Sequence, residues 1–357
     1  MPLLPLYGHV ALRARLREAI ARSSLPASLL FHGPRGTGKQ QLALWVARVL
    51  LCENADRAPC DACQSCRLAV KLHHPDLHWY FPRPRLKGSD PDLADVRHDI
   101  AEGIAERLEN GGLYEPPGGD EALYVATVRA IVQSAVMSPA MGRKKVFVIG
   151  DAERMVAQEG SDQAANAFLK LLEEPPADTT LILTSSEPGA LLPTIRSRSV
   201  SVRVAALADA DVRAFLADET VANRLDLSSE QATSELVRFA GGAPGKLVAR
   251  EAWETAIRQA RRLLDAAQSL DRGTRMRAAL SQGASGARGK YADTLDALIV
   301  LLHDRSAAAA VKGNEREAAG AARAIDAIED AKEQADRNVN PQLVTAGLLR
   351  QIAPLMR

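Results

Sequence analysis

The stretch that decides the fold runs from Ser28 to Gln41 and reads SLLFHGPRGTGKQQ. Residues 28–31 are typical of a short buried strand, residues 33–38 form a glycine-rich turn, and residues 39–51 are typical of a helix. A strand, the pattern G-x-x-x-x-G-K and a helix together predict a phosphate-binding loop, in which backbone N–H groups converge on phosphate oxygens at the positive end of the helix. The predicted phosphate-binding residues are Gly33, Gly36, Gly38 and Lys39.

The residue after Lys39 departs from the pattern of an active ATPase. That position normally carries Ser or Thr, whose hydroxyl ligates Mg²⁺, but here it is Gln40. Mg²⁺ demands near-ideal octahedral geometry, and a glutamine amide is longer and places its oxygen wrongly for that ion. We therefore predict a loop of P-loop ancestry that does not hydrolyse ATP, while the binding of ATP and Mg²⁺ stays open.

The composition of the whole chain narrows the class of protein. Its 357 residues carry a formal net charge of +1, which lacks the basic excess typical of an autonomous DNA-coating protein. A hydrophobic content of 46% is sufficient for packed cores, and no apolar run approaches the roughly 18 residues of a membrane span. The first residues lack the pattern of a secretory signal. These features predict a soluble, cytoplasmic protein of two or three domains with no membrane partner.

All four cysteines of the chain lie in one short window just after the helix predicted at residues 39–51. A tetrahedral Zn²⁺ ion takes four thiolates, and such a closed shell leaves no open catalytic position. The sequence therefore predicts a structural Zn²⁺ site. Its ligands are Cys52, Cys60, Cys63 and Cys66. Because these four complete the shell, we interpret the nearby His73, His74 and His78 as surface or packing residues.

Strands alternate with helices through roughly the first 205 residues. Beyond the first strand, further strands are expected at residues 77–81, 145–149, 180–183 and 199–204. This alternation predicts an α/β domain with a mostly parallel sheet covered on both faces. Residues 83–121 interrupt it with Pro and Gly breakers around an amphipathic helix expected at 94–109, and we interpret them as an insertion on the surface.

After Ala205 the strand pattern stops and the chain becomes all-α. Residues 207–250 contain short helical stretches and a Gly-Gly-Ala-Pro-Gly turn, and residues 251–357 are rich in Ala, Leu, Arg and Glu. The second stretch predicts four or five helices, because these residue types favour helix.

Several motifs together resemble the bacterial DNA polymerase III clamp loader, an AAA+ family. The P-loop and the four cysteines just after its helix belong to this resemblance. The further motifs are His74-Pro-Asp76, Asn166-Ala-Phe-Leu-Lys-Leu-Leu-Glu-Glu-Pro-Pro176, Thr184-Ser-Ser-Glu-Pro188, Ile195-Arg-Ser-Arg198 and Asn338-Val-Asn-Pro-Gln-Leu343. The resemblance covers nearly the whole chain except roughly residues 83–121.

The resemblance implies three parts and a set of partners. The parts are an AAA+ domain at residues 1–206, with the zinc module at 52–66 and the insertion at 83–121, a helical lid at 207–250 and a helical collar at 251–357. The implied complex is a hetero-pentamer with gamma/tau and delta subunits, which opens the sliding clamp and places it on primed DNA.

Three catalytic elements separate the chain from the motor subunits of that family. In the P-loop, Gln40 replaces the magnesium hydroxyl. In the segment after the strand at 145–149, Gly150 stands where the magnesium-binding Asp is expected and Asp151 where the catalytic Glu is expected. In the sensor 2 element, Gly245 replaces the arginine, with Lys246 beside it. Three damaged catalytic elements together match the non-hydrolysing stator subunit better than a motor.

One catalytic element of the family is retained. The segment Ser197-Arg198-Ser199 resembles the family's Ser-Arg-Cys motif, with Ser199 in place of the cysteine. The resemblance implies that Arg198, with Ser197, is an arginine finger directed into the ATP site of a neighbouring motor subunit. A guanidinium there stabilises the charge that develops on the γ-phosphate.

Three other functions stay open. The first is an ATP-hydrolysing motor of the gamma/tau type, against which Gln40 and Gly150 argue. The second is a P-loop kinase of small molecules, which leaves the Leu-Glu-Glu-Pro-Pro run and the cysteines without a role. The third is a zinc-dependent DNA-binding regulator, which needs a basic recognition helix that the sequence does not show.

Overall fold

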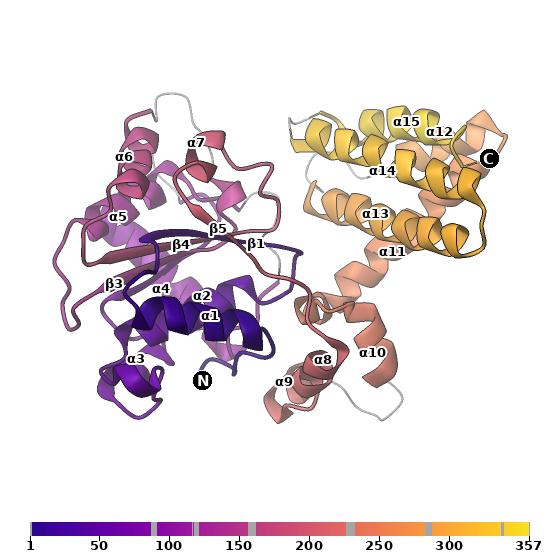
Figure 1. Cartoon of the computed structure of the whole chain (residues 1–357). Coiled ribbons are helices and arrows are strands. Elements are labelled where there is room, and N and C mark those ends of the chain that lie inside the picture. The colour runs from indigo at the N-terminus through magenta and orange to yellow at the C-terminus, as the bar shows by residue number, and fades with distance from the viewer. Residues whose placement is uncertain are drawn as a thin grey trace. The chain divides into compact units, whose positions relative to one another are not determined.

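The computed structural model divides the chain into two compact units, residues 1–248 and 249–357 (Figure 1). The structure describes residues 2–86, 91–115, 117, 121–155, 162–225, 233–282, 288–336 and 339–356. Within these ranges no helix combines the length and the apolar character that a membrane span requires.

The first unit is built on a parallel sheet. Among the described residues the sheet has five strands, in the order β2-β3-β4-β1-β5, and each strand pairs in parallel with its neighbours. The strands are β1 (Ser28–His32), β2 (Leu77–Tyr80), β3 (Lys145–Ile149), β4 (Thr179–Ser185) and β5 (Val200–Arg203). The α/β prediction is confirmed, and the observed strand bounds differ from the expected ones by only one or two residues.

Two hydrophobic cores cover the two faces of the sheet, because successive side chains of a strand point to opposite faces. In β3, Val146 and Val148 enter the first core, whereas Phe147 and Ile149 enter the second. The helices that pack into the first core are α1 (Val10–Ala21), α2 (Lys39–Leu51) and α3 (Gln64–Ala69). Helices α5 (Val125–Ala135), α6 (Asp162–Glu173) and α7 (Pro193–Arg196) pack into the second core, together with part of α4 (Leu93–Glu109).

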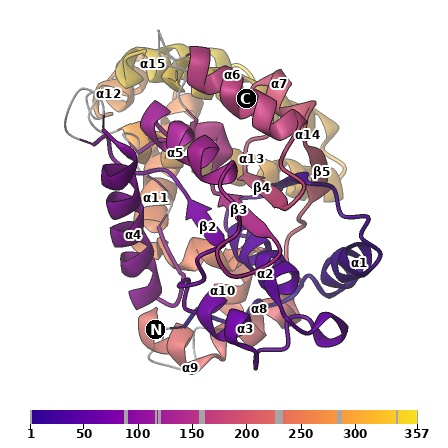
Figure 2. The ribbon, with the colours of Figure 1, turned by 90° about the vertical axis from the view of Figure 1, so that its left-hand side faces the viewer.

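The interpretation of residues 83–121 as a surface insertion is wrong for their described part. Helix α4 (Leu93–Glu109) lies beside the edge strand β2 (Figure 2). Val96 and Ile100 are buried in the second core, and Ile104 and Leu108 pack against the first. The amphipathic pattern identified the helix, but its apolar face covers the edge of the sheet. This segment is therefore part of the folded domain.

This packing predicts a large effect of a charge on the buried face of α4. We expect Ile100→Asp to lower the free energy of unfolding by about 3 kcal/mol, because it removes a buried side chain and places an unpaired carboxylate in the core. The matched control is Ala101→Asp on the exposed face of the same helix, which should cost less than about 0.5 kcal/mol. Urea unfolding of the full chain measures both, and equal losses would restore the surface interpretation.

A small helical cluster completes the first unit after β5. Its helices are α8 (Asp209–Leu216), α9 (Glu219–Arg224) and α10 (Thr233–Ala240), followed by the single turn Pro244–Leu247. Val212 and Val237 form part of its own hydrophobic core, which the N-terminal Leu4 also enters. The Tyr7 hydroxyl donates a hydrogen bond of 2.6 Å to Asp218, so the N-terminal segment ties this cluster to the rest of the unit.

The second unit is all-α within the described residues, as predicted. Its helices are α11 (Arg250–Gln268), α12 (Arg272–Leu280), α13 (Arg288–Val311), α14 (Glu315–Asp336) and α15 (Pro341–Ile352). Alanines on the buried face of α14, among them Ala321 and Ala324, pack against a core that contains Leu298 of α13 and Leu348 of α15. Within the Asn338–Leu343 motif, Asn338 lies outside the described residues, and Asn340 caps α15 by accepting from the amide of Gln342.

Candidate functional site: the P-loop and the cysteine cluster

The predicted P-loop joins β1 to α2, as the motif requires. Gly36 and Gly38 have φ angles of 81° and 84°, in the left-handed region where glycine is favoured. The Gly36 carbonyl accepts a hydrogen bond of 2.9 Å from the amide of Gly245, which belongs to the helical cluster after β5. A Cβ atom on Gly36 would lie 3.1 Å from the backbone nitrogen of Lys246. The predicted sensor 2 position therefore lies directly against the P-loop.

The Lys39 ammonium group is bound by the protein itself. It donates hydrogen bonds to the carbonyls of Gly33 and Pro34, at 3.0 and 2.8 Å, and to the Ser186 hydroxyl, at 2.9 Å. Burial lowers the pKa of Lys39 to about 8. The negative charges of Asp151 and Glu153 raise this pKa but do not outweigh the burial. An ammonium group has three donors, and all three are engaged here.

Gln40 stands at the position where an active P-loop carries the hydroxyl that binds Mg²⁺. Both the nitrogen and the oxygen of its side-chain amide are hydrogen-bonded. Its amide nitrogen donates to an Asp151 carboxylate oxygen at 2.9 Å. Its amide oxygen accepts from the Trp79 indole at 2.9 Å and from the Arg107 guanidinium at 3.2 Å. Gln40 is 3% exposed, so this is a buried and satisfied amide rather than a flexible side chain.

The Cα of Gly150 lies directly against the amide group of Gln40. A Cβ atom on Gly150 would lie 2.5 Å from the carbon, nitrogen and oxygen of the Gln40 amide. An aspartate at this position is therefore incompatible with the observed position of Gln40. The glutamine at position 40 and the glycine at position 150 look like separate departures in the sequence, but in the structure they form one feature.

Sequence reasoning did not single out one residue of this network, Arg107 of α4. Its guanidinium carbon lies 4.7 Å from the ring centre of Trp79, 3.4 Å from that of Phe81 and 3.8 Å from that of Tyr114. Burial is the main cause that lowers the pKa of Arg107 to about 10. The position offered a signal, because Arg107 falls on the same helix face as the apolar Val96 and Ile100.

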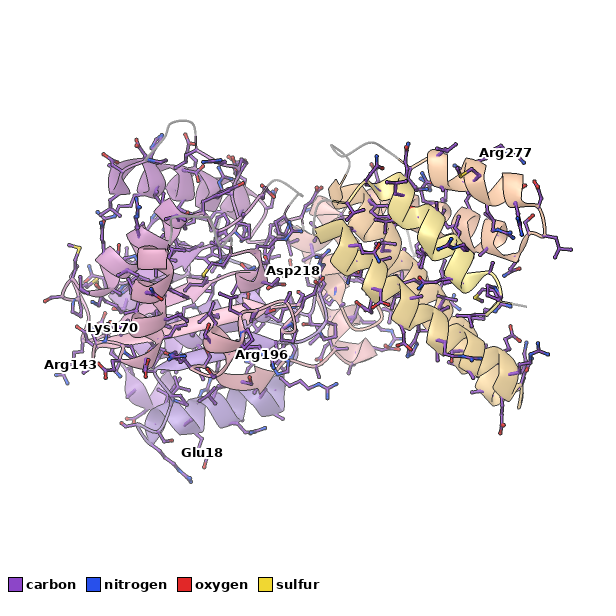
Figure 3. The ribbon with its side chains drawn as sticks, turned by 90° about the horizontal axis from the view of Figure 1, so that it is seen from above. Glu18, Arg143, Lys170, Arg196, Asp218 and Arg277 are labelled. Carbon is purple, nitrogen blue, oxygen red and sulfur yellow. The ribbon has the colours of Figure 1, made fainter. Side chains whose placement is uncertain are left out.

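Ser197 caps the C-terminus of α7, and Arg198 follows it. Among the described residues neither side chain is recorded in contact with the P-loop. Arg198 pairs with Glu173 of α6, its Nε lying 3.0 Å from a carboxylate oxygen, and donates to the Thr194 carbonyl at 3.2 Å. The Arg198 side chain is 32% exposed. The Ser197 hydroxyl donates to the same Thr194 carbonyl. The neighbouring Arg196 is labelled in Figure 3.

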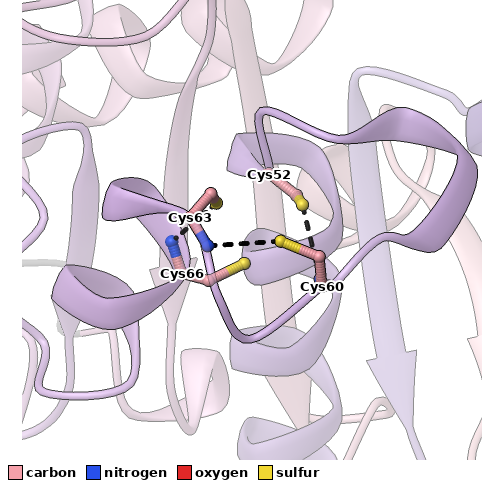
Figure 4. A group of neighbouring side chains, drawn as sticks. All are labelled: Cys52, Cys60, Cys63 and Cys66. Carbon is pink, nitrogen blue, oxygen red and sulfur yellow. Dashed lines mark hydrogen bonds between the residues drawn. The ribbon is translucent and has the colours of Figure 1, made fainter.

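The four cysteines converge as their spacing predicted (Figure 4). Their sulfur atoms all lie within 4.8 Å of one another. The sulfur of Cys60 accepts from the amide of Cys63, and the sulfur of Cys63 accepts from the amide of Cys66 (Figure 4). Amides of Ala62 and Cys63 are the main cause that lowers the pKa of Cys60 to about 6. Burial raises the pKa of Cys52 and of Cys66, so the amides favour the thiolate most clearly at Cys60. The donor set still fits a tetrahedral metal ion, because four converging cysteine sulfurs are ligands that such an ion takes.

Two of the nearby histidines are packing residues, as interpreted from the sequence. The Nδ1 atom of His74 accepts from the amide of Asp76 at 3.1 Å, and His74 is 2% exposed. The His78 ring stacks on Phe147 with 4.5 Å between ring centres.

The strand order, the P-loop between β1 and α2, and the helical cluster after β5 define a P-loop domain of the AAA+ class. A protein-family model described as "DNA polymerase III, delta subunit" matches residues 8–208, and the chain belongs to this family.

Several curated proteins are similar to the chain. The DNA polymerase III subunit delta' of Pseudomonas aeruginosa is 32% identical over 216 residues, which cover 60% of this chain and 52% of that protein. The subunit delta' of Bacillus subtilis is 29% identical over 183 residues, covering 51% and 43%. The subunit gamma/tau of Mycobacterium tuberculosis H37Rv is 30% identical over 239 residues, covering 66% and 34%. The chain spans about half the length of the delta' relatives that it matches.

One similar solved structure is a DNA polymerase III gamma subunit-related protein from Thermotoga maritima. The match covers 96% of this chain and 100% of that chain, with 16% sequence identity and a TM-score of 0.39.

Proposed function

We propose that the chain is a delta'-type subunit of the bacterial DNA polymerase III clamp loader. In this proposal it joins gamma/tau and delta subunits in a hetero-pentamer that places the sliding clamp on primed DNA in the cytoplasm. The family match and the similarity to delta' subunits support this assignment. The subunit would act as a stator that hydrolyses no ATP of its own.

The observation that carries the stator proposal is the Gln40 amide at the magnesium position. Phosphoryl transfer in P-loop enzymes needs a metal ion that bridges the β- and γ-phosphates and is held by a hydroxyl and a carboxylate. Here the hydroxyl is absent, and the amide that replaces it leaves no space for a carboxylate at position 150. The Lys39 ammonium is also saturated by Gly33, Pro34 and Ser186.

The purified chain should therefore show no ATP hydrolysis above background. Steady-state phosphate release at millimolar ATP and Mg²⁺ measures it, with and without primed DNA. A Lys39→Ala variant is the control for contaminating ATPases, because a rate that belongs to this site must disappear in it. A DNA-stimulated rate that Lys39→Ala abolishes would favour the second candidate function, a gamma/tau-type motor. The similarity to the mycobacterial gamma/tau subunit supports this candidate.

We also propose that Cys52, Cys60, Cys63 and Cys66 hold one structural Zn²⁺ ion. Four converging sulfurs form a closed shell, which gives the ion a structural rather than a catalytic role. The site would fix the loop between α2 and α3.

The finer part of the proposal assigns Arg198, with Ser197, to the ATP site of a neighbouring motor subunit. Arg198 is partly exposed, and its partner Glu173 is 57% exposed. An ion pair of this kind is worth about 0–1 kcal/mol, so exchange of the carboxylate for a phosphate costs little. Arginine suits the role because it stays charged and its planar fork can engage two phosphate oxygens.

A further inference from the structure

Helix α1 lies against α2 (Figure 1). A cluster of three arginines, Arg13, Arg17 and Arg48, covers this place. The guanidinium carbons of Arg13 and Arg17 lie 5.0 and 5.7 Å from the centre of the Trp45 ring. Arg48, one turn after Trp45 on α2, pairs with Asp61 of the cysteine loop. Trp45 is 4% exposed, because the Arg13 and Arg17 side chains cover its ring. Arg17 is exposed and Arg13 half-buried, whereas the Arg48 side chain is only 14% exposed.

Helices α1 and α2 themselves supply few acids, and the neighbouring cysteine loop adds Asp61, which pairs with Arg48. Residues 10–51 contain seven Lys or Arg residues and a single acid, Glu18, in a chain whose net charge is only +1. Glu18 is paired with Arg22 at 2.6 Å on α1. Arg13 and Arg17 are four residues apart on one helix face, where like charges destabilise a helix. Burial, followed by the charges of Arg17 and Arg48, lowers the pKa of Arg13.

The cluster also contains an unsatisfied donor. The Nε atom of Arg48 is buried and has no hydrogen-bond partner among the residues that the structure describes. Asp61 engages a different nitrogen, Nη2, of the same guanidinium. A buried donor without a partner is costly. Among the described residues Asp61 pairs with Arg48 alone, and the Arg13 guanidinium donates to the Leu6 carbonyl at 3.3 Å, so the three arginines keep an excess of positive charge.

We propose that Arg13, Arg17 and Arg48 bind a phosphate group of a nucleic-acid backbone. A phosphodiester can accept hydrogen bonds from more than one guanidinium fork, whereas a planar carboxylate is satisfied by one bidentate arginine. Because Trp45 is covered, the site offers no exposed ring on which a base could stack, and binding is independent of sequence. This inference rests on neither the P-loop nor Arg198 and stands apart from the proposed function.

The test compares two exposed arginines of α1 that differ in the face they occupy. Anisotropy of a fluorescein-labelled 30-base-pair DNA duplex at about 50 mM salt gives the dissociation constant of the purified full chain. We expect Arg17→Gln to weaken binding severalfold and to lower the slope of log K against log salt by about 1, the effect of one lost phosphate contact. The matched control Arg15→Gln removes the same charge outside the cluster and should change binding less than twofold.

A second pair of variants separates geometry from folding. Arg13→Gln combined with Arg17→Gln should lower the salt slope by about 2. Arg17→Lys keeps the charge but not the fork, and it should recover only part of the affinity. Thermal unfolding monitors each variant, and if the double variant unfolds, the exposed single variant Arg17→Gln still decides.

Three results would overturn the inference. The first is equal weakening by Arg15→Gln and Arg17→Gln, which would indicate diffuse charge. The second is absence of duplex binding by the unaltered chain at low salt. The third is binding of poly-glutamate that Arg17→Gln abolishes while DNA binding is unchanged, which would assign the cluster to an acidic protein segment.

Discussion

Arg198→Ala should assemble into the clamp-loader complex normally yet lower the DNA- and clamp-stimulated ATPase rate of that complex severalfold. The proposed finger acts on the ATP site of a neighbour, so its loss slows hydrolysis there without touching the chain's own P-loop. In GTPases an arginine finger contributes roughly 10³–10⁵ in rate, which is an upper limit here because the other motor sites keep their own fingers. Steady-state phosphate release by the reconstituted complex at saturating clamp and primed DNA measures the effect.

Two control variants sharpen this test. Arg198→Lys keeps the charge but loses the planar fork, and it should also be impaired. Arg196→Ala replaces the last residue of α7, two positions before Arg198, and should have a much smaller effect. Unaltered rates in both Arg198 variants would contradict the finger assignment and leave the subunit an architectural role.

Removal of the metal should produce the largest effect on stability. We expect about one equivalent of zinc in protein purified without chelator, and less than half an equivalent in Cys60→Ser combined with Cys63→Ser. In zinc-finger peptides the binding of structural Zn²⁺ contributes about 10–16 kcal/mol, which is an upper limit because the rest of this domain folds around its own cores. The loop between α2 and α3 should then become sensitive to limited proteolysis.

The control for the metal variants lies in the same loop. Ala62→Ser changes an exposed side chain and keeps all four sulfurs, so zinc content and protease resistance should be unchanged. Elemental analysis together with digestion of matched samples gives both readouts. Full protease resistance of the double cysteine variant without zinc would contradict a structural metal.

The sequence was most informative where a local pattern carries the chemistry. The glycine pattern placed the P-loop between a strand and a helix, and the cysteine spacing identified four sulfurs that the structure brings within 4.8 Å. Alternation of apolar strands with helices predicted the parallel sheet. In each case the signal lies within a few tens of residues, so no long-range packing had to be known.

The network around Gln40 could not be predicted in the same way. Gln40 meets Asp151 and Arg107, which are 111 and 67 residues away in the sequence, so their contacts depend on how the strands and α4 pack. The steric conflict between Gln40 and a side chain at position 150 is visible only in three dimensions. The surface interpretation of residues 83–121 failed for a related reason, since an amphipathic pattern does not say what the apolar face covers.

In the proposed role, the chain's own nucleotide site is silent, while Arg198 acts in the ATP site of a neighbouring subunit. One measurement separates the two roles: the rate at which reconstituted complexes load the sliding clamp onto primed DNA, with either Lys39→Ala or Arg198→Ala confined to this subunit. Size-exclusion chromatography first shows that both variants assemble. We expect nearly unaltered clamp loading with Lys39→Ala and severalfold slower clamp loading with Arg198→Ala. The reverse pattern would contradict a silent nucleotide site combined with an arginine finger.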